Sequence, residues 1–181
     1  FAQAENPARR GVVIDYIEEL GGQLYGTIVF KGDTTYFVSG PVYCNGPVTI
    51  EGGAVFKYPN STGPNATTAY IKLNNTVTCK TSSYRPAIFT AADDNSIGDA
   101  ITTDEWANYT GQLTYPDPIT GDPVQKYYSN PAILSYWVSA PTLSNVRFCY
   151  AQEAVRLEGA NVNGTLSHAQ LVNCIRGIVL M

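Results

Sequence analysis

The sequence has little charge, one histidine and no long apolar run, and each shortage excludes a class of protein. Charged residues make up 14% of the 181 residues, and the net charge of −4 includes no basic block. A nucleic-acid phosphate backbone would therefore find little to bind. No apolar run approaches the roughly 20 residues that span a bilayer as a helix. The sequence thus predicts neither a nucleic-acid partner nor a membrane span.

The four cysteines lack the Cys-x-x-Cys spacing that zinc sites use, although their even number would permit disulfides in an exported protein. The last two, Cys149 and Cys174, are 25 residues apart. On stacked straight strands their Cα atoms would be about 8 Å apart, beyond the ~7 Å limit for a disulfide. A bend between them could still permit the bond, but we expect buried free thiols at Cys44, Cys79, Cys149 and Cys174.

Gly, Pro, Thr and Asn are frequent, and from Thr27 onward they separate short β-prone runs such as "TIVF", "VTIEGG", "AVFKY" and "AYIKL". This pattern predicts an all-β architecture with many turns. Before it, apolar residues at helical spacing precede Gly21-Gly22, a typical helix stop. These residues are Val13, Tyr16, Ile17 and Leu20. We therefore expect a short helical cap within residues 1–26.

A repeat of 23 residues decides the kind of β architecture. The tripeptide Thr-Leu-Ser occurs at 142–144 and again at 165–167. The same shift carries apolar residues onto apolar residues, and it equates Asn145 with His168, which suggests a polar turn position. Such self-similarity is typical of a solenoid, in which each coil stacks its apolar face on the next. The predicted column pairs are Phe148–Leu171, Val155–Ile178, Leu157–Leu180, Val48–Ile71 and Ile50–Leu73.

The stretches "LSNVRFCYAQEAVRLEG", "LSHAQLVNCIRGI", "TIEGGAVFKY" and "YRPAIFTAADDNSIGD" resemble the secreted bacterial proteins of the pectate-lyase-like superfamily. The resemblance implies a right-handed parallel β-helix with coils of about 23 residues over 27–181. A segment without strand pattern at about 99–131 is expected to be a long loop insertion. The superfamily contains lyases, glycosidases and adhesins, so the resemblance is informative for fold and poor for function.

Enzymes of that superfamily usually cleave acidic polysaccharides with Asp-bound calcium and an Arg base, or with clustered carboxylates. The Asn-x-Asp, paired-Asp and Gly-His elements of its polygalacturonases are absent, so no catalytic residue is predicted. The segment "AADDNSIGDA" could still hold Ca²⁺ through oxygen ligands, and a solvated Asx-rich turn is the alternative. The candidate calcium ligands are Asp93, Asp94, Asn95 and Asp99. No other cofactor is predicted.

Aromatic rings in and after the long segment could stack on sugar rings, or could instead cover the side of the solenoid. The candidate stacking residues are Trp106, Tyr109, Tyr127, Tyr128 and Trp137. Arg147, Arg156 and Arg176 are candidate clamps for an acidic substrate, although the repeat equates Arg147 with Gln170 and so predicts no arginine ladder.

Two features bear on localisation. Ala2-Gln3-Ala4 has the small-x-small form found at the end of secretory signals, although an ordinary polar terminus would look the same. Five Asn-x-Ser/Thr sequons are candidate glycosylation sites in an exported protein. They begin at Asn60, Asn65, Asn74, Asn108 and Asn163. A secreted or cell-surface protein is therefore expected.

Two functions are compatible with these patterns. The first is a non-catalytic structural or interaction module of an extracellular assembly, able to polymerise end to end into a filament. Its contact would be the last coil, where Ile178 and Leu180 need a cover, either the rest of a longer chain or another copy. The second is a carbohydrate-binding or polysaccharide-degrading domain.

Overall fold

The computed structural model describes residues 17–62, 66, 68–101, 111–136, 141–159 and 164–181. Their regular structure consists of β-strands throughout, which confirms the predicted all-β class. Within these ranges no helix occurs, and hence none that could cross a membrane.

The helical cap predicted within 1–26 is wrong where it can be compared, because residues 17–24 form strand β1 (Ile17–Leu24). A register shift between Leu20 and Gly22 bends this strand where it pairs with β3. Leu20 faces the core, whereas Ile17 packs on the outer side against the cluster of Phe37, Ala92 and Ile101. Their three-residue spacing fitted one face of a helix, but an extended strand places the two side chains on opposite faces. Val13 and Tyr16 lie outside the described residues.

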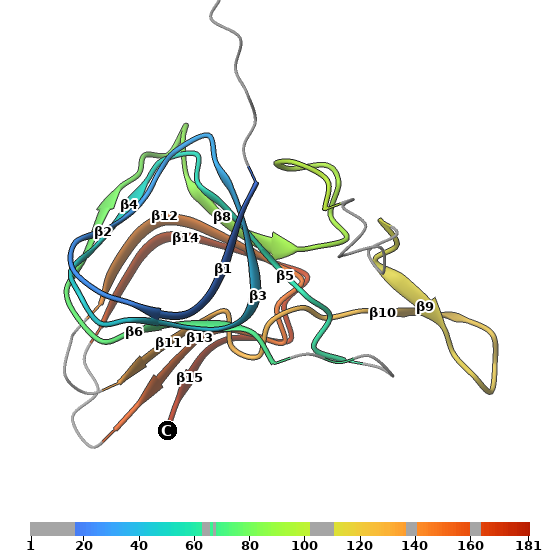
Figure 1. Ribbon diagram of the computed structural model, residues 1–181. Coiled ribbons are helices and arrows are strands. Elements are labelled where there is room, and N and C mark those ends of the chain that lie inside the picture. The colour runs from blue at the N-terminus through green and yellow to red at the C-terminus, as the bar shows by residue number, and fades with distance from the viewer. Residues whose placement is uncertain (1–16, 63–65, 67, 102–110, 137–140, 160–163) are drawn as a thin grey trace, which may run out of the picture.

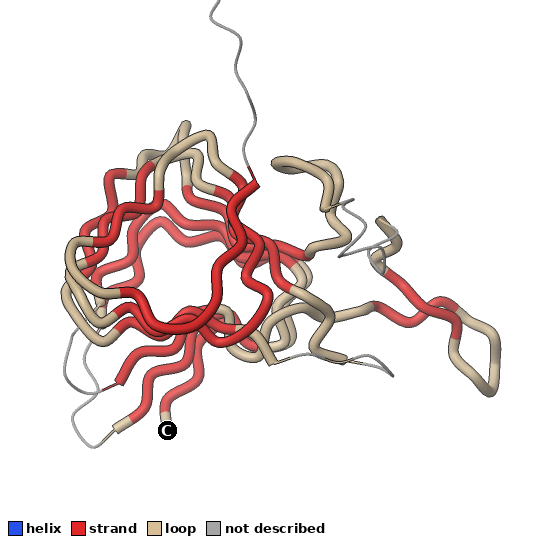
Figure 2. The backbone as a smooth tube through the Cα atoms, viewed as in Figure 1, coloured by secondary structure: helices blue, strands red, loops and turns tan. Residues whose placement is uncertain are grey.

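The chain winds as a parallel β-solenoid whose strands stack on successive faces (Figures 1 and 2). The first face stacks β1 and the long β3 (Thr35–Cys44) with β5 (Val55–Tyr58), β8 (Ala87–Ala91), β12 (Thr142–Cys149) and β14 (Thr165–Val172). The second face stacks the ends of β1 and β3 with β6 (Tyr70–Leu73), β11 (Ile133–Tyr136), β13 (Glu153–Glu158) and β15 (Arg176–Leu180). The third face holds β2 (Ile28–Phe30), β4 (Val48–Glu51) and β7 (Val77–Lys80). All of these pairings are parallel.

The predicted 23-residue repeat is correct in the C-terminal coils. Phe148 pairs with Leu171, Val155 with Ile178, and Leu157 with Leu180. Asn145 and His168 both have positive φ, 48° and 50°, so they occupy the same left-handed turn in consecutive coils. The interpretation of His168 as a polar turn residue agrees with this geometry.

The same repeat is wrong in the N-terminal half. Val48 pairs with Val77, not with Ile71, and Ile50 pairs with Cys79, not with Leu73. Coil length varies because the corners differ: Thr35 pairs with Val55, which in turn pairs with Ile88. Strands on different faces share the two-residue alternation, so a shift of 23 still superposed apolar residues that lie on different faces.

Aromatic rings form a continuous column inside the first face. The ring centroids of Tyr36 and Phe56 are 5.3 Å apart, those of Phe56 and Phe89 4.6 Å, and those of Phe89 and Phe148 4.7 Å, all with nearly parallel planes. These spacings approach the distance of about 4.8 Å between paired strands. The column therefore follows directly from in-register stacking, and Leu171 ends it.

Polar residues also stack, at the corner after the second face. The side-chain amide of Asn45 donates to Gln23 Oε1 at 2.7 Å, and that of Asn74 donates to Asn45 Oδ1 at 2.9 Å. At another corner, a Cβ on Gly32 would lie 2.4 Å from the carbonyl oxygen of Gly52. Only glycine allows the coils to approach so closely there.

The four cysteines are free thiols in the structure. Cys44 and Cys149 are buried as predicted, whereas Cys79 and Cys174 are only half-buried. Burial raises the pKa of the Cys44 thiol to about 12 and that of the Cys149 thiol to about 11, so both are neutral near pH 7 and act as small apolar side chains.

The chain leaves the stack after β8 and returns at β11, as the colours of Figure 1 show. Between them, β9 (Thr114–Pro116) and β10 (Pro123–Gln125) form an antiparallel hairpin that projects from the solenoid.

The aromatic column predicts a specific sensitivity to truncation. Phe89→Ala removes a ring stacked on both sides and should lower the free energy of unfolding by about 3–5 kcal/mol. Phe89→Leu fills more of the space and should cost less. Chemical denaturation measures both, and equal, small losses for the two variants would contradict the column.

Candidate functional site

The insertion leaves the solenoid directly after β8, at residue 92, earlier than the predicted start at about 99. Its first part, residues 92–101, lies on the outer side of the first face. Ala92 and Ile101 are buried against Phe37, whose side chain points outward from β3. The Asp99 amide donates to Thr35 Oγ1 at 2.9 Å. A face that would otherwise meet solvent is thus covered by the chain itself.

A buried lysine holds residues 92–101 against the first face. Lys57 points outward from β5, yet its side chain is fully buried beneath the insertion. Its ammonium donates to the carbonyl oxygens of Asp94 at 2.8 Å and Asp99 at 2.5 Å. Burial lowers the pKa of Lys57, and the charges of Asp94 and Asp99 oppose that shift. The residue joins strand and insertion by charge-assisted hydrogen bonds.

Two of the predicted calcium ligands take part in the same network. Asp94 accepts hydrogen bonds from Thr90 Oγ1 at 2.7 Å and from Ser96 Oγ at 2.5 Å. Asp93 accepts from the Tyr128 hydroxyl at 2.6 Å, and Lys126 lies 3.3 Å from the same carboxylate. These protein donors occupy oxygens that a calcium ion would use.

The alternative of a solvated turn is wrong for Asp93 and Asp94, which are 2% and 4% exposed. The Asp94 carboxylate bonds back to Thr90 of β8, and the Asp93 carboxylate bonds to Tyr128 and to the amide of Gly111. Asn95 is exposed and Asp99 is half-buried. Among the described residues, no three His, Cys, Asp or Glu side chains are grouped as a metal site would require. Calcium binding stays a prediction.

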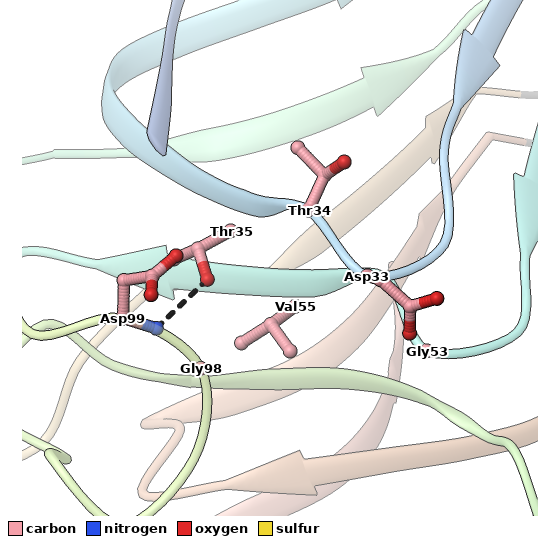
Figure 3. Close-up of a pocket in the computed structure, with 7 residues that line it drawn as sticks. All are labelled: Asp33, Thr34, Thr35, Gly53, Val55, Gly98 and Asp99. Atoms are coloured by element: carbon pink, nitrogen blue, oxygen red, sulfur yellow. Dashed lines mark hydrogen bonds between the residues drawn. The ribbon is translucent and has the colours of Figure 1, made fainter. Parts of the chain in front are cut away.

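A polar hollow of about 520 Å³ opens between the coil corner and the insertion (Figure 3). The carboxylates of Asp33 and Asp99 and the hydroxyls of Thr34 and Thr35 line it, together with Val55 and the backbone at Gly53 and Gly98. A second hollow of about 410 Å³ shares Asp33 and adds Glu51, Lys80 and Arg85. Arg85 forms an ion pair with Asp33. The first hollow offers hydrogen-bond acceptors and hydroxyls to a polar ligand.

The predicted sugar-stacking residues do not come together as one platform. Tyr128 is fully buried, so its ring is not accessible to a sugar. Tyr127 is half-buried, and its backbone bonds to Ser61 and Thr62. The remaining three, Trp106, Tyr109 and Trp137, lie outside the described residues.

A different aromatic group lies on the outer side of the second face. The hydroxyls of Tyr43 and Tyr70 are 3.0 Å apart, and the Lys72 ammonium lies 4.1 Å from the ring centre of Tyr136. The alternation of side chains within β3, β6 and β11 is enough to predict that these residues point outward. The sequence did not predict that they are neighbours, because the 23-residue shift gave β6 the wrong partner strand. Lys72 covers the Tyr136 ring through a cation–π contact, which favours a structural role.

The candidate arginine clamps are engaged within the protein. Arg156 and Arg176 both pair with the buried Glu153, at 2.5 and 2.9 Å. Arg147 donates to Gln170 Oε1 at 2.7 Å. The observed register places Arg147 beside Gln170, so the prediction that these arginines form no ladder is confirmed.

Two of the five sequon asparagines are described. Asn60 Oδ1 accepts from the amide of Thr62, the third residue of its sequon, at 3.0 Å. Asn74 uses its side-chain amide in the corner ladder, so a glycan there would be attached to the nitrogen that donates to Asn45. The others, Asn65, Asn108 and Asn163, lie outside the described residues.

The last coil presents an apolar surface that we call the C-terminal rung, defined by Leu171, Ile178 and Leu180. Their side chains are 47%, 53% and 69% exposed. Ile178 and Leu180 border a groove of about 350 Å³ whose other walls include Leu143, Val155, Leu157 and Leu166. The predicted contact residues Ile178 and Leu180 are therefore exposed among the described residues and lie on the same strand, β15.

No protein-family model matches the chain, and no curated protein or solved structure matches it.

Replacing the buried lysine tests how the insertion is held. Lys57→Met keeps much of the apolar stem but leaves two carbonyls without their donor, which should cost about 1–3 kcal/mol. Hydrogen exchange at the Asp99 amide should accelerate about tenfold or more. The matched control is Lys72→Met, which should leave that amide unchanged. Equal exchange rates in the two variants would show that Lys57 does not hold the insertion.

Proposed function

We propose that the protein is a non-catalytic structural or interaction module whose C-terminal rung is a contact surface, covered either by a second copy of the chain or by the rest of a longer chain. The observation that supports this function most is that Leu171, Ile178 and Leu180 are apolar yet largely exposed, although Phe148, Val155 and Leu157, with which they pair, are buried. Burying such side chains contributes about 1.5–3 kcal/mol each when they become fully covered. Strands β14 and β15 also offer edges to which another strand can bond.

The ionisable groups favour the same function. Lys57, Asp93 and Asp94 are used to hold the insertion. Glu153 is used to hold two arginines. A catalytic site needs titratable groups that face a substrate and can act on it. These buried charges are instead bonded to other parts of the protein.

The resemblance extends this proposal. We infer that the solenoid is a right-handed β-helix of the pectate-lyase-like kind, exported and exposed at a cell surface or in an extracellular assembly. Parallel pairing on every face of the stack supports the first part. The second part depends on the resemblance and on the form of Ala2-Gln3-Ala4.

Substitution of the rung tests the proposed function. The double variant Ile178→Asp, Leu180→Asp places two carboxylates on the contact surface, so concentration-dependent association in light scattering should disappear. Ile119→Asp is the matched control, because Ile119 is 92% exposed at the projecting hairpin. It should associate like the original chain. Persistent association of the double variant would place the contact elsewhere.

Carbohydrate binding is the second candidate, and the hollow between Asp33 and Asp99 favours it. Carboxylates and hydroxyls accept hydrogen bonds from sugar hydroxyls, and Val55 adds an apolar wall. The carboxylates would repel an acidic sugar, so a neutral saccharide fits better.

Calorimetric titration separates these ligands. Cellohexaose should bind more tightly than oligogalacturonate, and Asp99→Asn should weaken cellohexaose binding about tenfold through loss of a charged acceptor. Asp122→Asn, at an exposed position on the hairpin, is the control. Absence of binding by both saccharides would remove this candidate.

A further inference from the structure

The two Asp-Pro bonds of the sequence both lie in the hairpin that projects from the solenoid, at 117–118 and 122–123 (Figure 1). We propose that the second bond, between Asp122 and Pro123, is a self-cleavage site at which the Asp122 carboxylate breaks its own peptide bond in mild acid. This inference is independent of the proposed function, because these residues belong neither to the C-terminal rung nor to the polar hollow.

The reaction needs a carboxylate on the residue directly before a proline. An oxygen of the Asp122 carboxylate attacks the carbonyl carbon of the same residue, and the C–N bond to Pro123 breaks while the proline nitrogen takes a proton from a hydronium ion. The cyclic anhydride that forms is opened by water, which leaves Asp122 as a C-terminal residue. Proline favours this route because its tertiary amide has no N–H, so ring closure through that nitrogen cannot compete.

The hairpin leaves the Asp122 carboxylate free for this attack. Its side chain is exposed, and among the described residues none donates a hydrogen bond to the carboxylate. The Asp122 amide donates to Thr120 Oγ1 at 3.2 Å, which fixes the backbone. The amide of Asp117 donates to the Asp122 carbonyl oxygen at 2.7 Å. This donor points at the oxygen on which negative charge develops during the attack, and therefore stabilises that charge.

The first Asp-Pro bond provides an internal comparison. The carbonyl oxygen of Asp117 also accepts an amide hydrogen bond, from Gly121 at 2.9 Å, so the two carbonyl groups are alike. The carboxylates differ, because Asp117 Oδ1 accepts from the amides of Thr120 at 3.0 Å and Ile119 at 2.8 Å. These hydrogen bonds lower the pKa of the Asp117 carboxyl. The carboxylate must leave both donors before it can attack, so we expect the bond to Pro118 to break more slowly.

The other charged groups near the hairpin do not interfere with this reaction. Tyr115 and Asp117 are the remaining ionisable residues of 114–125, and Lys126 is directed to the Asp93 carboxylate at 3.3 Å. Among the described residues, β9 and β10 pair only with each other. The cleavage rate therefore rises with acidity, through the proton that the leaving nitrogen needs, until acid protonates the attacking carboxylate.

Cleavage at this bond should leave the two parts of the chain together. The first part contains β6 and β8, with which β11 and β12 of the second part pair. The Tyr128 hydroxyl of the second part donates to the buried Asp93 of the first at 2.6 Å. The product is therefore a solenoid whose chain is interrupted only in the projecting hairpin.

Mass spectrometry tests the proposal, at the lowest pH at which circular dichroism still shows the native β signal. Fragments 1–122 and 123–181 should accumulate, and fragments cut after Asp117 should form at least about tenfold more slowly because of the two hydrogen bonds to its carboxylate. In guanidinium chloride at the same pH the turn is lost, and the two bonds should break at similar rates. An intact folded chain, or the same ratio of the two cuts in folded and denatured chain, would overturn the proposal.

Two variants at exposed or turn positions identify the attacking group. Asp122→Ala removes the carboxylate and should abolish cleavage at 122–123. Asp117→Asn is the matched control, because it keeps the side-chain oxygen that accepts in the turn, and it should be cleaved at 122–123 like the original chain. The cleaved chain should elute unchanged in size-exclusion chromatography while denaturing electrophoresis separates two fragments. Undiminished cleavage of Asp122→Ala would overturn the proposal.

Discussion

The structure depends on in-register stacking of parallel strands, which places equivalent side chains one strand spacing apart. Tyr36, Phe56, Phe89 and Phe148 show the result, with ring centroids between 4.6 and 5.3 Å apart. The corners adapt to the same spacing through stacked amides and through glycines at the closest backbone contact. Inward-facing side chains such as Phe89 are buried because coils on both sides cover them. The side chains of the C-terminal rung have such a neighbour on one side only among the described residues, and they are exposed.

The outer side of the solenoid is organised by a second, polar arrangement. Lys57 and the carboxylates of Asp93 and Asp94 lie between the first face and the insertion, and their partners belong to the protein itself. The carboxylates of Asp93 and Asp94, which the sequence offered as calcium ligands, therefore hold the insertion against the solenoid. Among the described residues, the C-terminal rung and the polar hollow are the two surfaces on which the proposed functions depend.

The sequence predicted the solenoid because the 23-residue repeat at the C-terminal end is undisturbed, as Phe148 and Leu171 demonstrate. It failed for Val48, since corners of variable length change the shift between coils and a two-residue alternation cannot tell one face from another. Ile17 and Leu20 imitated one face of a helix, although they pack on opposite sides of the extended strand β1. Lys57 could not be recognised as buried, because nothing local indicates that residues 92–101 return to cover β5. The hollow escaped prediction because it joins a corner to a distant loop.

The central claim is that variable coils still stack in one register. Nuclear Overhauser contacts between methyl groups test it most directly, at the position where sequence and structure disagree. The account predicts a strong contact between the methyls of Val48 and Val77, neighbours on the third face, and a weak contact or none between Val48 and Ile71. A strong contact between Val48 and Ile71, with none to Val77, would contradict it.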